Sequence, residues 1–157
     1  MKITRIYVDT SVIGGCCDPE FQEWSYGLLS NFQTGYFLLL LSELIDAEIQ
    51  EAPMEVKSVY VEFRKCAHEV IEMTSEAIEL ADAYLDHKIL PIHYRNDARH
   101  IAIATIAGAD VMVSWNFKHV VHYEKVQKFN AVNAEWGYKP ILISSPREVT
   151  THGGKSS

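Results

Sequence analysis

The chain has few cysteines, no long apolar run and a deficit of basic side chains. Its three cysteines are Cys16, Cys17 and Cys66, and an adjacent pair with one remote residue fits neither a disulfide framework nor a thiolate metal site. No apolar stretch approaches the roughly 18 residues of a membrane-spanning helix; the longest, Phe37 to Leu41, suits a strand. The first residues lack the apolar core and cleavage site of a signal peptide. We therefore expect a cytoplasmic protein with no membrane partner.

The charge balance is acidic. The sequence has 14 Lys and Arg against 21 Asp and Glu, a formal net charge of −7. This argues against a protein that holds nucleic acid on a general basic surface. It leaves room for an enzyme whose acids surround a metal ion and which meets a polyanion at one local basic rim.

Apolar runs alternate with segments of helical periodicity. We predict strands at 3–8, 36–41, 70–73, 109–114 and 141–143, and helices from about 18 to 34, 43–52, 55–68, 75–87 and 97–107. Residues 120–136 are predicted as a loop with a short helix. This alternation is typical of a single three-layer α/β/α domain with a mostly parallel central sheet. The domain is predicted to cover 1–149, and 150–157 to form a polar, frayed tail.

Polar side chains follow the ends of these predicted strands. Asp9 comes directly after the first strand, although it would also suit the N-cap of a helix. Glu48 shares a helix with apolar neighbours, and Asp97 lies in the first turn of an alanine-rich helix. Ser114 and Asn116 follow the fourth strand. Since parallel strands end at one edge of a sheet, we expect these side chains to meet there.

Converging carboxylates repel each other, so a fold that keeps them together usually binds a divalent cation. Ligands that are all oxygens favour Mg²⁺ or Mn²⁺ over zinc. Such ions polarise phosphoryl oxygens, generate hydroxide and stabilise a leaving alkoxide. The pattern therefore indicates hydrolysis of phosphodiesters.

Four segments carry a family resemblance. They are residues 7–13 (YVDTSVI), Ser42 with Glu48 six residues later, residues 97–105 (DARHIAIAT) and residues 111–116 (VMVSWN). In this order and spacing they resemble the PIN domain, especially the VapC-like ribonucleases of bacterial toxin–antitoxin pairs. The resemblance runs from about residue 3 to about residue 120. It implies a PIN-like fold and a Mg²⁺- or Mn²⁺-dependent endoribonuclease, with RNA as substrate, an antitoxin protein as partner and a homodimer.

The resemblance also implies roles for individual residues. Asp9, Glu48 and Asp97 correspond to the first three catalytic, metal-binding acids of the family. The supporting hydroxyls are those of Thr10, Ser11 and Ser114. Many members carry a fourth acid where this chain has Asn116, and a nearby alternative acidic position holds His119. Asn116 can offer a carbonyl oxygen to a metal or fix a water, but it brings no charge, so we expect weaker metal binding.

Other polar and aromatic residues near these segments have two interpretations. Four basic residues could hold substrate phosphates or form an ordinary charged surface. His100 is predicted to be a half-buried packing residue, because no second histidine shares its face. Trp115 and Phe117 are predicted to pack at the core or rim, although such rings also stack on single-stranded RNA. The four basic residues are Arg95, Arg99, Lys118 and His119.

Two further hypotheses come from other functional classes. Without a fourth acid, the chain could be a catalytically weakened module that binds RNA or a protein partner. It could also be a phosphatase with Asp9 as covalent nucleophile. Haloacid-dehalogenase-like enzymes use a second acid two residues later, where this chain has Ser11, so we rank this hypothesis last. Glu48 as a solvated helix acid, and Asp97 as an acid matched to the helix dipole, are the structural alternatives.

Overall fold

A five-stranded parallel sheet forms the middle layer of the computed structural model, which describes residues 2–154. Its order is β3-β2-β1-β4-β5, and each neighbouring pair is parallel. The strands are nearly continuous apolar runs because helices cover both faces. The predicted three-layer α/β/α PIN-like fold is confirmed. The strands are β1 (Arg5–Val8), β2 (Leu38–Ser42), β3 (Ala67–Ile71), β4 (Val111–Val113) and β5 (Leu142–Ser144).

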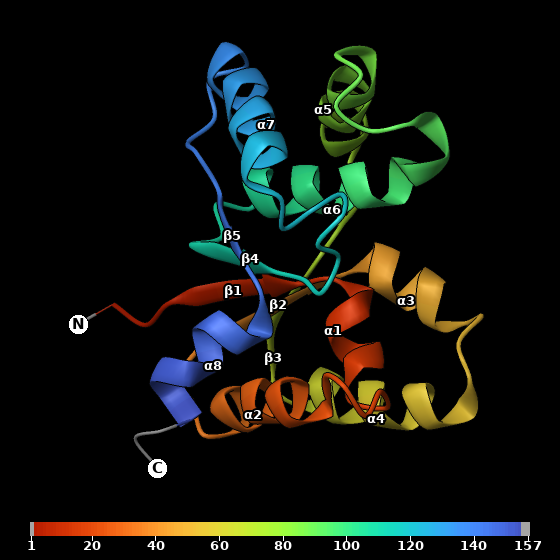
Figure 1. Ribbon diagram of the computed structural model, residues 1–157, viewed down its shortest axis with the longest axis vertical. Coiled ribbons are helices and arrows are strands. Elements are labelled where there is room, and N and C mark those ends of the chain that lie inside the picture. The colour runs from red at the N-terminus through yellow and green to blue at the C-terminus, as the bar shows by residue number, and fades with distance from the viewer. Residues whose placement is uncertain (1, 155–157) are drawn as a thin grey trace.

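Helices form the two outer layers (Figure 1). One side of the sheet carries α5, α6 and α7, and the other carries α1, α2, α4 and α8. Within residues 2–154, no helix is both long and apolar enough to cross a membrane. The helices are α1 (Thr10–Gly15), α2 (Gln22–Gln33), α3 (Glu43–Ile49), α4 (Met54–Lys65), α5 (Ser75–Asp86), α6 (Arg95–Ile106), α7 (Tyr123–Glu135) and α8 (Pro146–Gly154), with a 3-10 turn η1 (Ile92–Tyr94).

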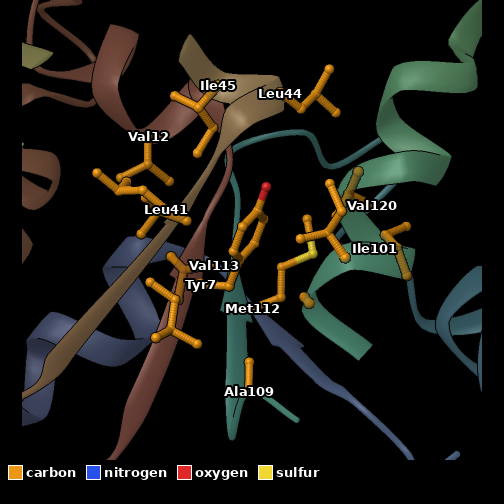
Figure 2. Close-up of a cluster of buried hydrophobic side chains, with 14 of the residues drawn as sticks. Tyr7, Val12, Leu41, Leu44, Ile45, Ile101, Ala109, Met112, Val113 and Val120 are labelled. Carbon is orange, nitrogen blue, oxygen red and sulfur yellow. The ribbon is translucent and has the colours of Figure 1, made fainter. Parts of the chain in front are cut away.

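The core is centred on β1, the middle strand. Ile6, Tyr7 and Val8 are fully buried, because β1 has a strand on each side and a helical layer on each face. Figure 2 shows the Tyr7 ring among apolar side chains, with its hydroxyl oxygen directed toward the end of the core where Leu44 and Ile45 lie. A polar atom is thereby placed inside the most buried part of the molecule.

The strand order reverses between β1 and β4. After β1 the chain enters α1 and α2 on one face, whereas after β4 it leads to α7 on the other face (Figure 1). Such a reversal opens a crevice at the carboxyl ends of the two strands, where parallel α/β proteins bind ligands. The Asp9 amide donates to the Val113 carbonyl at 3.3 Å, so the two strand ends are joined at this place.

Four local predictions were wrong. Residues 10–15, for which no helix was predicted, form α1, because Asp9 caps a new helix. The next helix begins at Gln22 instead of near Asp18, whose side chain accepts from the Glu20 amide. Residues 123–135 form the 13-residue helix α7, whose Phe129 is fully buried. Thr150, expected in a frayed tail, is buried within α8. Residues 155–157 of that tail lie outside the described part of the chain.

Candidate functional site

Asp9 lies buried at the end of β1 and has two structural roles. Its Oδ1 accepts from the Ser11 amide at 3.1 Å and the Ser11 hydroxyl at 2.5 Å, which makes it the N-cap of α1. Its Oδ2 accepts from the Ser114 hydroxyl, at the end of β4, at 2.6 Å. The carboxylate therefore bridges the two strand ends at the crevice, and the cap does not use all of its oxygens.

Asp97 reaches the same place from the first turn of α6. Its Oδ2 accepts from Asn116 Nδ2 at 3.1 Å. The Asn116 amide N–H donates to Ser114 Oγ at 3.0 Å, and its side-chain oxygen accepts from the His119 amide at 2.9 Å. Asn116 is thus fixed at three points, and its amide group holds the Asp97 carboxylate.

Glu48 lies one residue before the end of α3. Its Oε1 accepts from Thr10 Oγ1 at 2.6 Å and from His100 Nε2 at 2.7 Å, and the Asn96 side chain also hydrogen-bonds to the carboxylate. Thr10 belongs to α1, while Asn96 and His100 belong to α6. Glu48 is therefore held between elements from both faces of the sheet and is not a solvated helix acid.

The electrostatics of the three acids differ. Burial raises the pKa of Asp97 to about 6, helped by the negative charges of Asp9 and Glu48 and opposed by His100 and by the Asn116 hydrogen bond. Burial also raises the pKa of Asp9, against His100 and the two serine hydroxyls. For Glu48 burial acts in the same direction, but the electrostatic influence of His100 and the hydrogen bonds from His100 and Thr10 outweigh it, so its pKa is lowered. A bound cation would relieve the repulsion between the Asp9 and Asp97 carboxylates.

The predicted substrate-binding residues do not share one environment. Arg95 and Lys118 are exposed, and Arg99 is half-buried. His119 is only 6% exposed, and its ring packs against Tyr94 with centroids 4.0 Å apart. Neither ring nitrogen of His119 has a hydrogen-bond partner among residues 2–154. The side chains of Arg95 and Lys118 are thus open to solvent, while the His119 ring is part of the packing, and a role of the four residues in substrate binding stays a prediction.

The two aromatic residues beside Asn116 also differ. Trp115 is buried and stacks on Phe21 with centroids 4.1 Å apart, and its indole N–H donates to Ser25 Oγ at 2.8 Å. Phe117 is half exposed. The packing interpretation holds for Trp115, and Phe117 lies at the rim.

The sequence interpretation missed the role of His100. Its ring is buried, and both of its ring nitrogens contact polar groups. Its Nδ1 lies 2.6 Å from the Tyr7 hydroxyl, and this hydroxyl lies 2.8 Å from Ser42 Oγ. Two signals in the sequence could have found it. His100 is three residues after Asp97 and so lies on the same face of the helix, and Tyr7 has a hydroxyl in an otherwise apolar buried strand.

The residues present fit a hard divalent cation by their chemistry. All donors at the crevice are oxygens or an amide, and Mg²⁺ commonly takes one or two carboxylates while keeping several waters. Within residues 2–154, no three His, Cys, Asp or Glu side chains group closely enough to hold a metal ion among themselves. The roles of Asp9, Asp97 and Glu48 as ligands of one ion therefore stay predictions.

Comparisons with known proteins identify the fold. No family model matches the chain, and no curated protein matches it in sequence. A solved structure, VapBC2 from Rickettsia felis bound to a DNA fragment from their promoter, contains a chain of similar fold with a TM-score of 0.59. The two chains are 15% identical over 90% of this chain and 98% of that one. At this identity the likeness establishes the PIN-like fold over nearly the whole chain.

Proposed function

We propose that this protein is a Mg²⁺- or Mn²⁺-dependent endoribonuclease of the PIN type. The observation that carries the proposal is the meeting of Asp9 and Asp97 at the crevice between β1 and β4, where the charge of Asp9 helps to raise the pKa of Asp97 to about 6. A buried and a half-buried carboxylate that repel each other are destabilising unless a cation binds them.

The chain's own residues would share the work of such a site. Asp9 and Asp97 would hold the ion with Glu48 as the third acid, Asn116 keeps Asp97 in place, and Ser11 and Ser114 orient Asp9. When bound, the ion supplies Lewis acidity toward the phosphate and lowers the pKa of its water. The exposed side chains of Arg95 and Lys118 could hold the RNA phosphates that flank the scissile bond.

The proposal is tested by titrating Mn²⁺ into the protein calorimetrically, beside cleavage of a single-stranded RNA with and without chelator. We expect Asp97→Asn and Asp9→Asn to lose both metal binding and cleavage while remaining folded. Asp82→Asn, which removes an exposed acid on α5, is the matched control and should behave as the wild type. Metal binding that survives in Asp97→Asn would contradict the proposal.

A second candidate is a PIN-fold module that binds RNA or a protein partner with little catalysis. Asn116 favours this binding module. It offers an amide donor to Asp97, whereas many members of the PIN family that the chain resembles have a charged acid at this position. Tight binding of RNA or of a protein partner by the folded wild type, with no metal-stimulated turnover, would select this candidate over the nuclease.

The partners expected from the resemblance belong to the same proposal. The structure with a similar fold is a VapBC2 assembly, which supports a search for an antitoxin-like protein partner. Co-expression with the adjacent open reading frames, followed by size-exclusion chromatography with light scattering, would test both this partner and the homodimer.

A further inference from the structure

We propose that His100 is a positioning residue that holds the Glu48 carboxylate ready to act at the cation site. The inference rests on the proposed function and concerns how this particular chain keeps its third acid in place. Its basis is the buried hydrogen-bonded chain from Ser42 through Tyr7 and His100 to Glu48.

Glu48 needs such support because its own helix is short and places the carboxylate where a negative charge is disfavoured. Helix α3 has only 7 residues, well below the roughly 12 at which an isolated helix becomes marginally stable. Glu48 lies in the last turn of α3, where the helix dipole disfavours a negative charge, and α3 has no basic residue in that turn. A free glutamate side chain would also lose rotamer entropy when it is fixed at a site.

His100 supplies the support from the opposite side of the crevice. Its Nε2 donates to Glu48 Oε1 at 2.7 Å, and His100 itself is only 2% exposed. The Thr10 hydroxyl donates to the same oxygen at 2.6 Å. With two donors on Oε1, the carboxylate is held in one orientation, and the Asn96 side chain is a further hydrogen-bond partner of the carboxylate.

Tyr7 and Ser42 fix the imidazole in turn. One direction of donation satisfies every polar group: the Ser42 hydroxyl donates to Tyr7, the Tyr7 hydroxyl donates to His100 Nδ1, and Nε2 donates to Glu48. Ser42 Oγ also caps α3 by accepting from the Ile45 amide at 3.4 Å. This series of hydrogen bonds thus begins at the N-terminus of α3 and ends at Glu48, in the last turn of the same helix. It passes through the core, and Figure 2 shows the Tyr7 hydroxyl within that core.

Partners of this kind that orient ligands typically affect metal affinity by about 10- to 100-fold when they are removed. We therefore expect His100→Leu to weaken Mn²⁺ binding by about that factor. His100→Gln keeps a side-chain N–H near the position of Nε2 and should recover most of the loss. Tyr84→Phe is the control, because Tyr84 is a buried tyrosine whose hydroxyl bonds to Asn133 away from the crevice; it should leave Mn²⁺ affinity unchanged.

The decisive measurement is a double-mutant cycle on Mn²⁺ affinity by calorimetry, with His100→Leu made in the wild type and in Glu48→Gln. If His100 acts through Glu48, its replacement has no further effect in the Glu48→Gln background. An equal loss in both backgrounds would overturn the positioning role and leave the nuclease proposal standing.

A second readout uses the metal-free protein. The imidazole ¹H–¹⁵N NMR signals of His100 should show a proton on Nε2 and should shift in Glu48→Gln and in Tyr7→Phe. Unchanged signals in Glu48→Gln would contradict the hydrogen bond itself. If the wild type shows these signals but binds no Mn²⁺, the proposed function fails, and the positioning role fails with it.

Discussion

At the scale of single residues, this protein uses each polar group at the crevice more than once. Asp9 caps α1 and also accepts from Ser114, so the helix-cap interpretation is confirmed, while its role as a site acid stays a prediction. Asn116 holds Asp97 and accepts from the His119 amide. Because each of these groups is hydrogen-bonded to a neighbouring element, a change of one charge there should alter the free energy of unfolding as well as the affinity for metal.

The raised pKa of Asp97 leads to a pH dependence of the metal-free protein. Its folded value of about 6 exceeds the ordinary 3.8, so the folded state binds more protons between these values and stability falls as pH rises through this window. Removing the negative charge of Asp97 should therefore stabilise the folded protein at neutral pH. We expect Asp97→Asn to unfold at a higher temperature than the wild type in chelator at pH 7, with a smaller gap at pH 5. Thermal unfolding followed by circular dichroism measures this, and a gap that does not change with pH would contradict it.

Asn116→Asp adds the carboxylate that many members of the resembling family carry. It replaces the hydrogen bond from Nδ2 to Asp97 by a repulsion, so without metal we expect a loss of about 1–3 kcal/mol in the free energy of unfolding, the usual cost of an unsatisfied buried polar group. In calorimetry we expect tighter Mn²⁺ binding. Gln127→Glu adds the same charge at an exposed position of α7 and should change neither quantity. Weaker Mn²⁺ binding in Asn116→Asp would argue against a cation at this place.

At the scale of elements, α1 shows how a short helix is placed by close packing. A Cβ at Gly15 would lie 2.5 Å from Ser25 Oγ and 2.6 Å from Trp115 Nε1, and these two atoms hydrogen-bond to each other. We expect Gly15→Ala to lower the free energy of unfolding by about 1–3 kcal/mol, as overpacking does. At Gly14 a Cβ would meet nothing within 4 Å, so Gly14→Ala should stabilise by about 0.5–1 kcal/mol through helix propensity. Urea denaturation of the two variants compares them, and equal effects would contradict the packing argument.

At the scale of the whole molecule, one sheet carries two helical layers. Phe63 of α4 and Phe129 of α7 are both fully buried, and α4 and α7 lie on opposite sides of the sheet (Figure 1). We expect Phe63→Ala and Phe129→Ala each to cost about 3–5 kcal/mol, and each to lower the same single unfolding transition, since the layers share one sheet. Phe117→Ala, at a half-exposed position, should stay within about 0.5 kcal/mol. Differential scanning calorimetry would contradict this view if one variant produced two separate transitions.

Much of this fold could be predicted from local patterns. The strand predicted before Asp9 and the helices predicted at 43–52, 75–87 and 97–107 appear as β1, α3, α5 and α6 within a few residues. Ser42 and Thr74 cap α3 and α5, and Gly108 follows α6 at positive φ. Such signals are short in range, because caps and strand periodicity depend on neighbouring residues. The length of α7 was underestimated, because its N-cap is His122, an unusual capping residue.

By itself the sequence determined the alternation of strands and helices, the acids at the strand ends and the resemblance of four segments to a PIN domain. Only the tertiary structure decided which polar groups meet. Tyr7, Ser42, Glu48 and His100 are separated by up to 93 residues in the chain, and their hydrogen bonds exist because β1, β2, α3 and α6 pack around one core. The same packing buried the ring of His119 while leaving Lys118 exposed. Burial and long-range contact arise from the whole fold, and no local pattern in the chain encodes them.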